Sequence, residues 1–596
     1  MRERFCVAAL LAFCACGPAV KDPSDGLMSI DVTPENQTLT YMGSPITVDY
    51  QAIGHYDDGH TEVLPDATFA LDTDGQRLGN IDVAQFKATG QAGGKGAVLA
   101  QAGTVVGGTS VIVVIHPVHL GPGVPTTGAG NFPDSPPMGA TSPTTLYPLD
   151  GAVMPASVKS PDVQWEGANG AGDLYRVRIS AGQFATVDTI LAAGTGFNLD
   201  NQVSDADWRM LVNSAGTGPI TFDVAYWNQA TSAAGAASRI VHMVPADITG
   251  AIYYWNLGQG QMEKIDSTGR KPAIPNPPAR ASATPAGTQG SRCVACHTVS
   301  RDGRYLAGSL WGGGLEGGVF DMSNPAVQTS DPAPTLAPVV EGSSYKQLFA
   351  TFNQDATRLM INDGLSLRVI NPATGQTVAT TGTPLPATNA AHPAWSPDGS
   401  TIAFVNNISL GGAAAPWAVD YDRGDLAIIP VTGPDAFGAA SNLVAASSVG
   451  ANYLAPSWPT FSPDSQWIIY SAGNNSRGMS GTTPYVGSLF LVNKNGGATV
   501  RLDTLCGGMA RCYLPNFSPY DAGGYYWVVF YSVRDYGNAL AGTKGTTRRQ
   551  MWIAAIDKSK LAQGGVDASA VAYWVPDQDV STNNMSAFWS LPTPIQ

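Results

Sequence analysis

The sequence predicts an all-β protein, in which two N-terminal β-sandwich domains are followed by a six-bladed β-propeller. The first reason is composition: glycine (68) and proline (43) are frequent among the 596 residues, while charged residues make up 13%. Such a composition is typical of short strands joined by many turns. The second reason is that the N-terminal part alternates short apolar and polar runs, as half-buried strands do. The third is a strand–turn–strand pattern that recurs along the C-terminal part.

The charge balance excludes some partners. The formal net charge is −14 and the isoelectric point is near 4.8. The phosphates of a nucleic acid would be repelled by this charge, so we expect no nucleic-acid partner. The sequence also contains neither G-x-S-x-G nor H-E-x-x-H, and we therefore expect no hydrolase site and name no catalytic residue.

The chain begins with a pattern that is typical of export. Arg2 and Arg4 precede the apolar stretch FCVAALLAFCA, which is too short to span a bilayer. The stretch ends in FCAC, which resembles a bacterial lipobox with Phe13 in place of the usual leucine. This resemblance implies that Cys16 is lipidated and anchors the exported protein in a membrane of the cell envelope, on the periplasmic side or at the cell surface. An ordinary secretory signal cleaved nearby is the alternative.

Two stretches before the propeller are predicted to form the β-sandwiches. Residues 27–116 form short runs of alternating apolar and polar residues, separated by turns, and resemble bacterial immunoglobulin-like domains of the second group. Residues 147–247 contain a central Trp165 and the alternating run LYRVRIS, and resemble a fibronectin type III module. The segment 117–146 is rich in Pro, Gly, Ser and Thr and is predicted to be a linker. The predicted boundaries are 1–16 (signal peptide), 17–26 (tether), 27–116, 117–146, 147–247 and 248–596 (propeller).

Six similar stretches follow, each with a Ser or Asn just before a turn. The clearest copy reads SPDG and is followed by STIAFV, an apolar run that we expect to be buried between blades. This signature resembles the TolB-like propellers, relatives of the WD-repeat proteins, over residues 248–596. The last copy stops after its first strand, so residues 250–269 are expected to complete that blade and close the ring. The six anchor positions are Ser300, Asn353, Ser396, Ser462, Ser518 and Ser590.

The most specific motif is CVACH, at residues 293–297. C-x-x-C-H is the attachment pattern of a c-type haem. By resemblance to the c-type cytochromes, Cys293 and Cys296 carry the thioether links of one covalent haem c, and His297 is the proximal iron ligand. The small helical fold of those cytochromes is not apparent around the motif, which leaves the sixth ligand open. A zinc site, a redox dithiol and a vestigial motif or structural disulfide are the alternatives.

Alignment of the repeats predicts a candidate for the distal iron ligand. When Ser300 is aligned with Ser396, Cys296 stands opposite His392 at the start of another inner strand. Inner strands line the central channel of a propeller, so we expect the haem at one mouth of that channel. His392 is the first candidate for the second metal ligand and Met585 is the second. A different or open distal position is the alternative, because the alignment predicts how far along its inner strand a residue lies and does not predict the direction of its side chain.

The function expected from these features is electron transfer by an exported lipoprotein that carries haem in its propeller, with an unidentified redox or protein partner. One alternative is a protein-binding propeller on a surface stalk, without a redox role. Another is a haem enzyme with an open distal site, since hydrazine-synthase-type subunits also hold a c-type haem in a propeller. Cys506 and Cys512, in LCGGMARCY, are expected to form a small disulfide because an exported chain meets oxidising surroundings.

Overall fold

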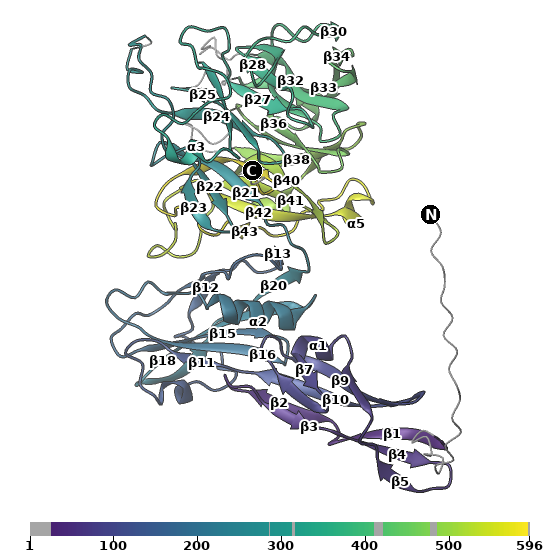
Figure 1. Cartoon of the computed structure of the whole chain (residues 1–596). Helices are drawn as coiled ribbons and strands as arrows, with labels where there is room; N and C mark the ends of the chain where they lie inside the picture. Colours follow the sequence, from purple (N-terminus) through teal and green to yellow (C-terminus); the bar gives the residue numbers. More distant parts are fainter. Residues whose placement is uncertain are drawn as a thin grey trace, which may run out of the picture. The chain divides into compact units, whose positions relative to one another are not determined.

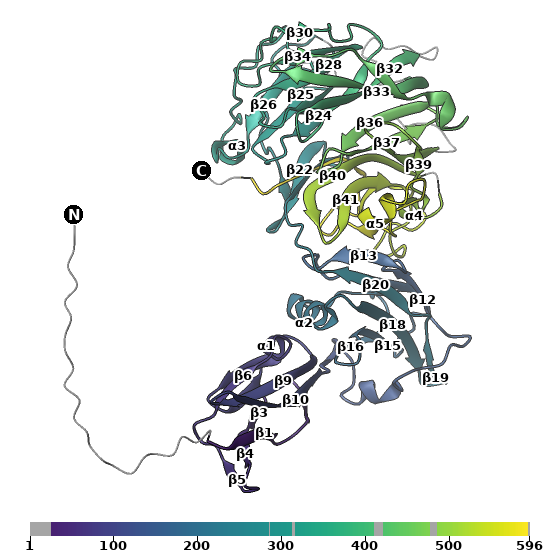
Figure 2. The ribbon, with the colours of Figure 1, turned by 90° about the vertical axis from the view of Figure 1, so that its right-hand side faces the viewer.

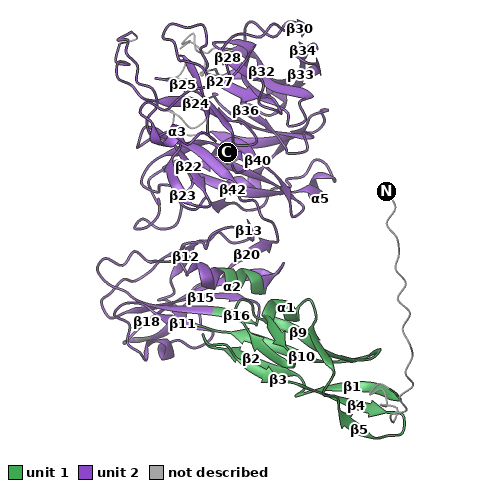
Figure 3. Ribbon diagram, in the orientation of Figure 1, with its two compact units in different colours: residues 1–117, 183–186, 209–214 green, residues 118–182, 187–208, 215–596 purple. Residues whose placement is uncertain are grey.

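The structure is a computed structural model in which strands far outnumber helices (Figure 1), so the all-β prediction is confirmed. The chain divides into two compact units (Figure 3): unit 1 comprises residues 1–117, 183–186 and 209–214, and unit 2 comprises the remainder. In the stretches that the structure describes, no helix is long and apolar enough to cross a membrane. Cys16, the predicted lipidation site, lies outside these stretches. The described residues are 25–284, 286–312, 316–409, 421–476, 486–509 and 511–593.

Unit 1 is built from small sheets. β1, β4 and β5 form one sheet; β6, β9, β10 and β2 form another, in which β2 runs parallel to β10; β3, β8 and β7 form a third. In β10, Val111, Val113 and Ile115 are buried and the residues between them are partly exposed, as expected for a strand with one face on a core. The bounds are β1 (Leu27–Thr33), β2 (Gln37–Tyr41), β3 (Thr47–Asp49), β4 (Gln51–Tyr56), β5 (Thr61–Val63), β6 (Thr68–Leu71), α1 (Gly75–Leu78), β7 (Gly79–Asp82), β8 (Gln85–Ala88), β9 (Gly94–Ala102) and β10 (Val105–Ile115).

The second sandwich lies in unit 2. One sheet has the order β13-β20-β18-β15-β16, with β19 added beside β18, and the other has the order β12-β14-β17. Trp165 of β14 is fully buried and its ring lies 5.1 Å from that of Tyr175 in β15, so an aromatic pair joins the two sheets. The bounds are β12 (Thr144–Tyr147), β13 (Ala152–Pro155), β14 (Val163–Glu166), β15 (Leu174–Ala181), β16 (Ala185–Ala192), β17 (Asp200–Asn201), β18 (Pro219–Asn228), β19 (Thr231–Gly235) and β20 (Arg239–Val244).

The segment 117–146, predicted as a linker, is folded onto this sandwich. It contains β11 (Val118–Leu120), which pairs with β16, and the 3-10 helix η1 (Gly128–Asn131). Its Phe132 is buried in one cluster with Leu174 of the sandwich. A few apolar residues are enough to hold the segment, although its composition is that of a loop.

The helix α2 (Asp205–Ala215) was not expected from the β pattern around it. Its first turn is capped by Ser204, whose hydroxyl accepts the backbone N–H of Asp207 at 3.1 Å, and it begins with acidic residues that favour a helix N-terminus. Gly216, with a φ of 58°, follows its end. These capping signals are present in the sequence SDADWRMLVNSAG and could have identified the helix.

The propeller takes up the rest of unit 2 (Figures 1 and 2). Its described residues form six sheets: β44-β21-β22-β23, β24-β25-β26, β27-β28-β29, β31-β32-β33 with β30, β34 and β35, β36-β37-β38-β39, and β40-β41-β42-β43. The strand written first is the inner strand, and each inner strand contacts those of the neighbouring sheets around a closed series. The bounds are β21 (Ala251–Asn256), β22 (Gln261–Asp266), β23 (Gly269–Pro272), β24 (Val294–Val299), β25 (Tyr305–Leu310), β26 (Gly317–Asp321), α3 (Ala326–Thr329), β27 (Phe349–Phe352), β28 (Leu359–Asp363), β29 (Ser366–Ile370), β30 (Thr381–Gly382), β31 (Ala391–Trp395), β32 (Thr401–Ser409), β33 (Arg423–Gly433), β34 (Ala436–Phe437), β35 (Ser441–Val444), η2 (Ala446–Ser448), β36 (Ala455–Phe461), β37 (Trp467–Gly473), β38 (Gly487–Asn493), β39 (Val500–Arg501), α4 (Asp503–Cys506), β40 (Cys512–Ala522), β41 (Tyr525–Ser532), β42 (Gln550–Asp557), α5 (Lys558–Leu561), β43 (Tyr573–Trp574) and β44 (Asn584–Ser590).

The anchor serines hold the turns that follow the inner strands. In three blades the hydroxyl donates to the carboxylate two residues further on and accepts the backbone N–H five residues further on. The aspartates therefore recur because they close turns. The three hydroxyl–carboxylate pairs are Ser300–Asp302 (2.5 Å), Ser396–Asp398 (2.6 Å) and Ser462–Asp464 (2.5 Å).

The strand β44 closes the ring. It pairs antiparallel with β21, from Ala251 opposite Ser590 to Asn256 opposite Asn584. The strands that precede the first repeat therefore complete the last blade, as the sequence predicts. This pairing covers an edge of β21 that would otherwise be exposed.

Candidate functional site

Five inner strands share one backbone irregularity, a residue of positive φ at a β-bulge. It stands four positions before the anchor serine, and the strand register shifts beside it. The structure therefore places Cys296 and His392 at equivalent positions of two blades, as the repeat alignment predicts. The bulge residues and their φ angles are Cys296 (48°), His392 (51°), Trp458 (56°), Leu514 (52°) and Ser586 (55°).

The two thiols of the CVACH motif are half-buried and are not joined to each other. Burial raises the pKa of Cys293 to about 11 and that of Cys296 to about 12, and the nearby Cys293 thiol contributes to the second shift. Their backbone is held in place, because the carbonyl of Cys293 accepts the N–H of Trp311 at 2.8 Å and that of Cys296 accepts the side-chain amide of Gln347 at 3.3 Å. The side chains are thus neighbouring, protonated thiols on a fixed strand.

His297 stands directly after the second thiol and is 4% exposed. Burial lowers the pKa of its imidazole to about 3. Hydrogen bonding with the backbone of Tyr253 and of Ser586 raises this pKa, but by less than burial lowers it. The ring meets Phe588 edge-on, with 5.0 Å between centroids. Its Nε2 atom is buried and has no hydrogen-bond partner among the described residues. At neutral pH this is an uncharged imidazole, the form that binds a metal.

The central channel holds a cavity of 160 Å³ that is lined by all six inner strands. His297 and His392 both line it, together with aromatic residues such as Phe349 and Trp458. Its described lining contains no carboxylate, and Arg301 supplies the charge. The structure thus brings the two predicted iron ligands to one cavity, which several aromatic rings also line.

His392 is 2% exposed and is held on several sides. Its ring stacks on Trp458 at 4.2 Å and meets Phe349 at 4.6 Å. Its Nδ1 atom lies 3.0 Å from the hydroxyl of Tyr421, while its Nε2 atom is buried without a partner in the described part of the chain. Burial lowers its pKa to about 3. Ligating histidines commonly have this arrangement, with one ring nitrogen held by a hydrogen bond.

Three further residues complete the description of the site. Met585, the second candidate for a distal ligand, packs beside Tyr513 and Leu514 and is not among the described residues that line the cavity. Trp458 and Tyr421 were not singled out in the sequence. The position of Trp458, four residues before an anchor serine, is a signal that could have identified it. No comparable signal marks Tyr421, which reaches His392 from outside the inner strands.

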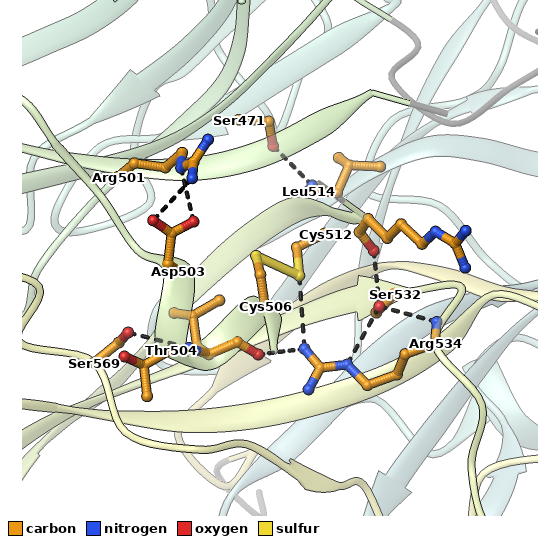
Figure 4. Close-up of a disulfide and its surroundings, with 12 residues drawn as sticks. Ser471, Arg501, Asp503, Thr504, Cys506, Cys512, Leu514, Ser532, Arg534 and Ser569 are labelled. Atoms are coloured by element: carbon orange, nitrogen blue, oxygen red, sulfur yellow. Dashed lines mark hydrogen bonds and ion pairs between the residues drawn. A yellow bond between two sulfur atoms is a disulfide. The ribbon is translucent and has the colours of Figure 1, made fainter. Parts of the chain in front are cut away.

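The other cysteine pair belongs to a different blade, and Figure 4 shows it with its surroundings. Cys506, in α4, and Cys512, at the start of β40, are joined by a disulfide. The buried guanidinium of Arg534 points to it, lies 3.6 Å from the sulfur of Cys512 and donates to the carbonyl of Leu505. It also lies over the ring of Trp552 at 4.7 Å. Burial lowers the pKa of Arg534 to about 9. This arrangement is structural, because the loop and the cation hold each other in a core.

The residues present fit a c-type haem in part. Two free thiols stand beside a neutral imidazole whose Nε2 atom has no partner in the described part of the chain, and this is the donor set that attachment and iron ligation need. However, Cys293 and Cys296 are not among the described residues that line the cavity of His297. The described stretches contain no group of three or more His, Cys, Asp or Glu side chains placed to hold a metal ion.

Comparisons with known proteins add little about function. No family model and no curated protein sequence matches the chain. Similar solved structures include a TolB protein of Agrobacterium tumefaciens (15% identity, 58% of this chain and 99% of that chain, TM-score 0.30). Others are a nidogen/laminin complex (9%, 58% and 100%, 0.34) and an ancestral GH74 enzyme (9%, 58% and 37%, 0.31). The propeller is therefore identified here from its own sheet order.

Proposed function

We propose that the protein carries one haem c, bound through Cys293 and Cys296, and that it transfers electrons. The observation that carries this proposal is the buried Nε2 atom of His297, which has no hydrogen-bond partner among the described residues and stands directly beside two free thiols. When bound, the haem supplies an iron that gains and loses one electron. His297 would be the proximal ligand, since burial keeps its imidazole neutral.

His392 is the proposed distal ligand. It lines the same cavity as His297, and its Nε2 atom is also without a partner among the described residues. Trp458, Phe349 and Tyr421 fix its ring, so little entropy would be lost on ligation. Two protein ligands favour electron transfer over substrate binding at the iron, because no position is left open.

The proposal includes a location. Cys16 would be lipidated and would hold the protein in the cell envelope, where an unidentified redox protein meets the propeller. The basic start, the apolar stretch and FCAC support this location. The Cys506–Cys512 disulfide supports it as well, since such bonds persist in oxidising compartments.

A protein-binding propeller without haem is the second candidate function. It is favoured by the position of the two thiols, which do not line the cavity in the described structure, and by the small size of that cavity, 160 Å³. In this case the motif would be structural or unoccupied.

The deciding experiment is a pyridine haemochrome spectrum of protein exported together with a cytochrome c maturation system. We expect one c-type haem per chain, and its complete loss in Cys293→Ala/Cys296→Ala. The matched control is Cys506→Ala/Cys512→Ala, which removes the other cysteine pair and should keep the haem. Protein without haem despite active maturation machinery would leave the protein-binding candidate.

The ferric absorption or EPR spectrum of the same protein tests the distal ligand. We expect low-spin iron in the wild type and high-spin iron in His392→Ala, while Met585→Ala stays low-spin. If the wild type is already high-spin and His392→Ala does not change it, His392 is not a ligand and a haem enzyme with an open position is favoured.

A further inference from the structure

A second cavity, of 530 Å³, lies within unit 2 between the second sandwich and the propeller. Its volume is in the range of small-molecule sites, which often form where modules meet. The walls are fixed by hydrogen bonds across the boundary: the side-chain amide of Asn538 donates to the carbonyls of Trp165, Asn198 and Leu199 at 2.9–3.1 Å. The cavity is therefore preformed.

The charged groups that line this cavity are mostly carboxyl groups. Asp162, Asp200 and Asp577 line it, and Lys159 is the ammonium group among the described lining residues. Lys159 is already paired with Asp577. Asp162 accepts a hydrogen bond from the side-chain amide of Gln164 at 3.0 Å. Asp162 and Asp200 are thus left facing the cavity without a basic partner among these residues.

Burial and mutual repulsion make the carboxyl pair costly. Burial, and to a smaller extent the charge of Asp200, raise the pKa of Asp162 to about 7, against hydrogen bonds from Gln164 and Tyr536 that lower it. Burial also raises the pKa of Asp200. A positive charge between the two groups would remove this penalty, since an opposite charge favours the ionised carboxylate.

The apolar wall of the cavity is aromatic. Tyr536 stacks on Trp574 at 4.1 Å with nearly parallel rings, and Tyr147 meets Tyr536 edge-on at 4.9 Å. The faces of such rings attract cations.

We propose that this cavity binds a small organic cation, a primary amine or a guanidine, with its charged group between Asp162 and Asp200 and its carbon chain against Tyr536 and Trp574. A calcium ion would need six to eight oxygen ligands, and the described residues contain no group of three or more His, Cys, Asp or Glu side chains placed to hold a metal ion. A neutral sugar would leave both carboxyl groups without a counter-charge. The site is independent of the haem motif and of the function proposed above.

Isothermal titration calorimetry of the full mature protein tests this site. The probes are cadaverine and agmatine, with pentane-1,5-diol as the neutral counterpart and calcium chloride as the metal. We expect both amines to bind at one site per chain and the diol to give no heat. Asp162→Asn should weaken amine binding about tenfold or more. The control Asp82→Asn, at an exposed position of unit 1, should leave it unchanged.

A second readout uses the carboxyl group itself. Between pH 5 and pH 7, titrations in buffers of different ionisation enthalpy should show proton release on amine binding, because the cation favours the carboxylate form of Asp162. Equal binding of the diol, binding of calcium alone, no amine binding at millimolar concentration, or unchanged affinity in Asp162→Asn would each overturn the proposal. If Asp162→Asn fails to fold, Asp200→Asn and Trp574→Leu take its place with the same expectation.

Discussion

The strands β24 and β31 occupy equivalent places in two blades, but they have different side chains at the bulge. Both are inner strands with a bulge four residues before the anchor serine. At the bulge, β24 has the half-buried thiol of Cys296, and β31 has the fully packed ring of His392. The residue that follows is His297 in β24 and Pro393 in β31. The repeat thus fixes the backbone, and the chemistry depends on the residues at two adjacent positions.

Acid should affect both strands and should have the largest effect on stability. His297 and His392 have pKa values lowered to about 3, against an ordinary 6.5. Between these values the unfolded chain binds more protons than the folded one, so stability is complete above pH 6.5 and falls as the pH drops toward 3. The loss approaches about 1.4 kcal/mol per pH unit for each ring. Urea unfolding of protein made without haem, at several pH values, measures it.

Single substitutions separate the two contributions to this acid sensitivity. The two rings together contribute a part of the slope, which is the change of unfolding free energy with pH. We expect about half of this part to be lost in His297→Gln and about half in His392→Gln. His242→Gln, at an exposed position of β20, is the matched control and should leave the slope as it is. Equal slopes in all four proteins would mean that the two buried rings do not titrate as their burial indicates.

Truncation at the bulge should distinguish the two strands. His392→Ala removes a ring that packs on Trp458 and Phe349, and should cost about 3 kcal/mol of unfolding free energy because a cavity remains. Cys296→Ala removes one half-buried sulfur and should cost less than about 1 kcal/mol. Chemical denaturation at pH 7 compares the variants. Similar losses for both would show that the bulge side chains contribute alike.

Backbone strain at the bulge should give the smallest effect. Cys296 has a φ of 48°, a conformation that glycine adopts freely and β-branched residues avoid. Relative to Cys296→Ala, we expect Cys296→Gly to be more stable by up to about 1 kcal/mol and Cys296→Val to be less stable by about 1–2 kcal/mol. Thermal unfolding of the three variants measures the order. The same order of stability (Gly, then Ala, then Val) at position 299, which lies outside the bulge, would contradict the explanation by backbone strain.

The propeller could be predicted because its signals are local and repeated. In three blades the turn after the inner strand has a serine and an aspartate at fixed offsets, and Ser396 with Asp398 shows why: the two side chains close the turn together. The pairing of β44 with β21 followed from a last repeat with one strand. The equivalence of Cys296 and His392 followed from the same alignment, since a repeat fixes the register.

Other features depend on contacts that no local pattern reveals. The segment 117–146 has the composition of a loop, but Phe132 gives it a place in a core. The second cavity joins Asp162 of the sandwich to Tyr536 of the propeller, and these residues lie far apart in the sequence. Its aspartates are isolated in the chain and resemble ordinary turn residues. For α2 the capping signals were present and the surrounding strand pattern outweighed them.

The pairing of β21 with β44 affects the order in which the propeller is completed. It joins residues 339 positions apart in the chain, and contacts of such long range form slowly. Synthesis begins at the N-terminus, so the first blade is made well before the strand that closes the ring. In that interval Cys293 and Cys296 stand on an open series of blades, where they are more accessible than in the closed ring.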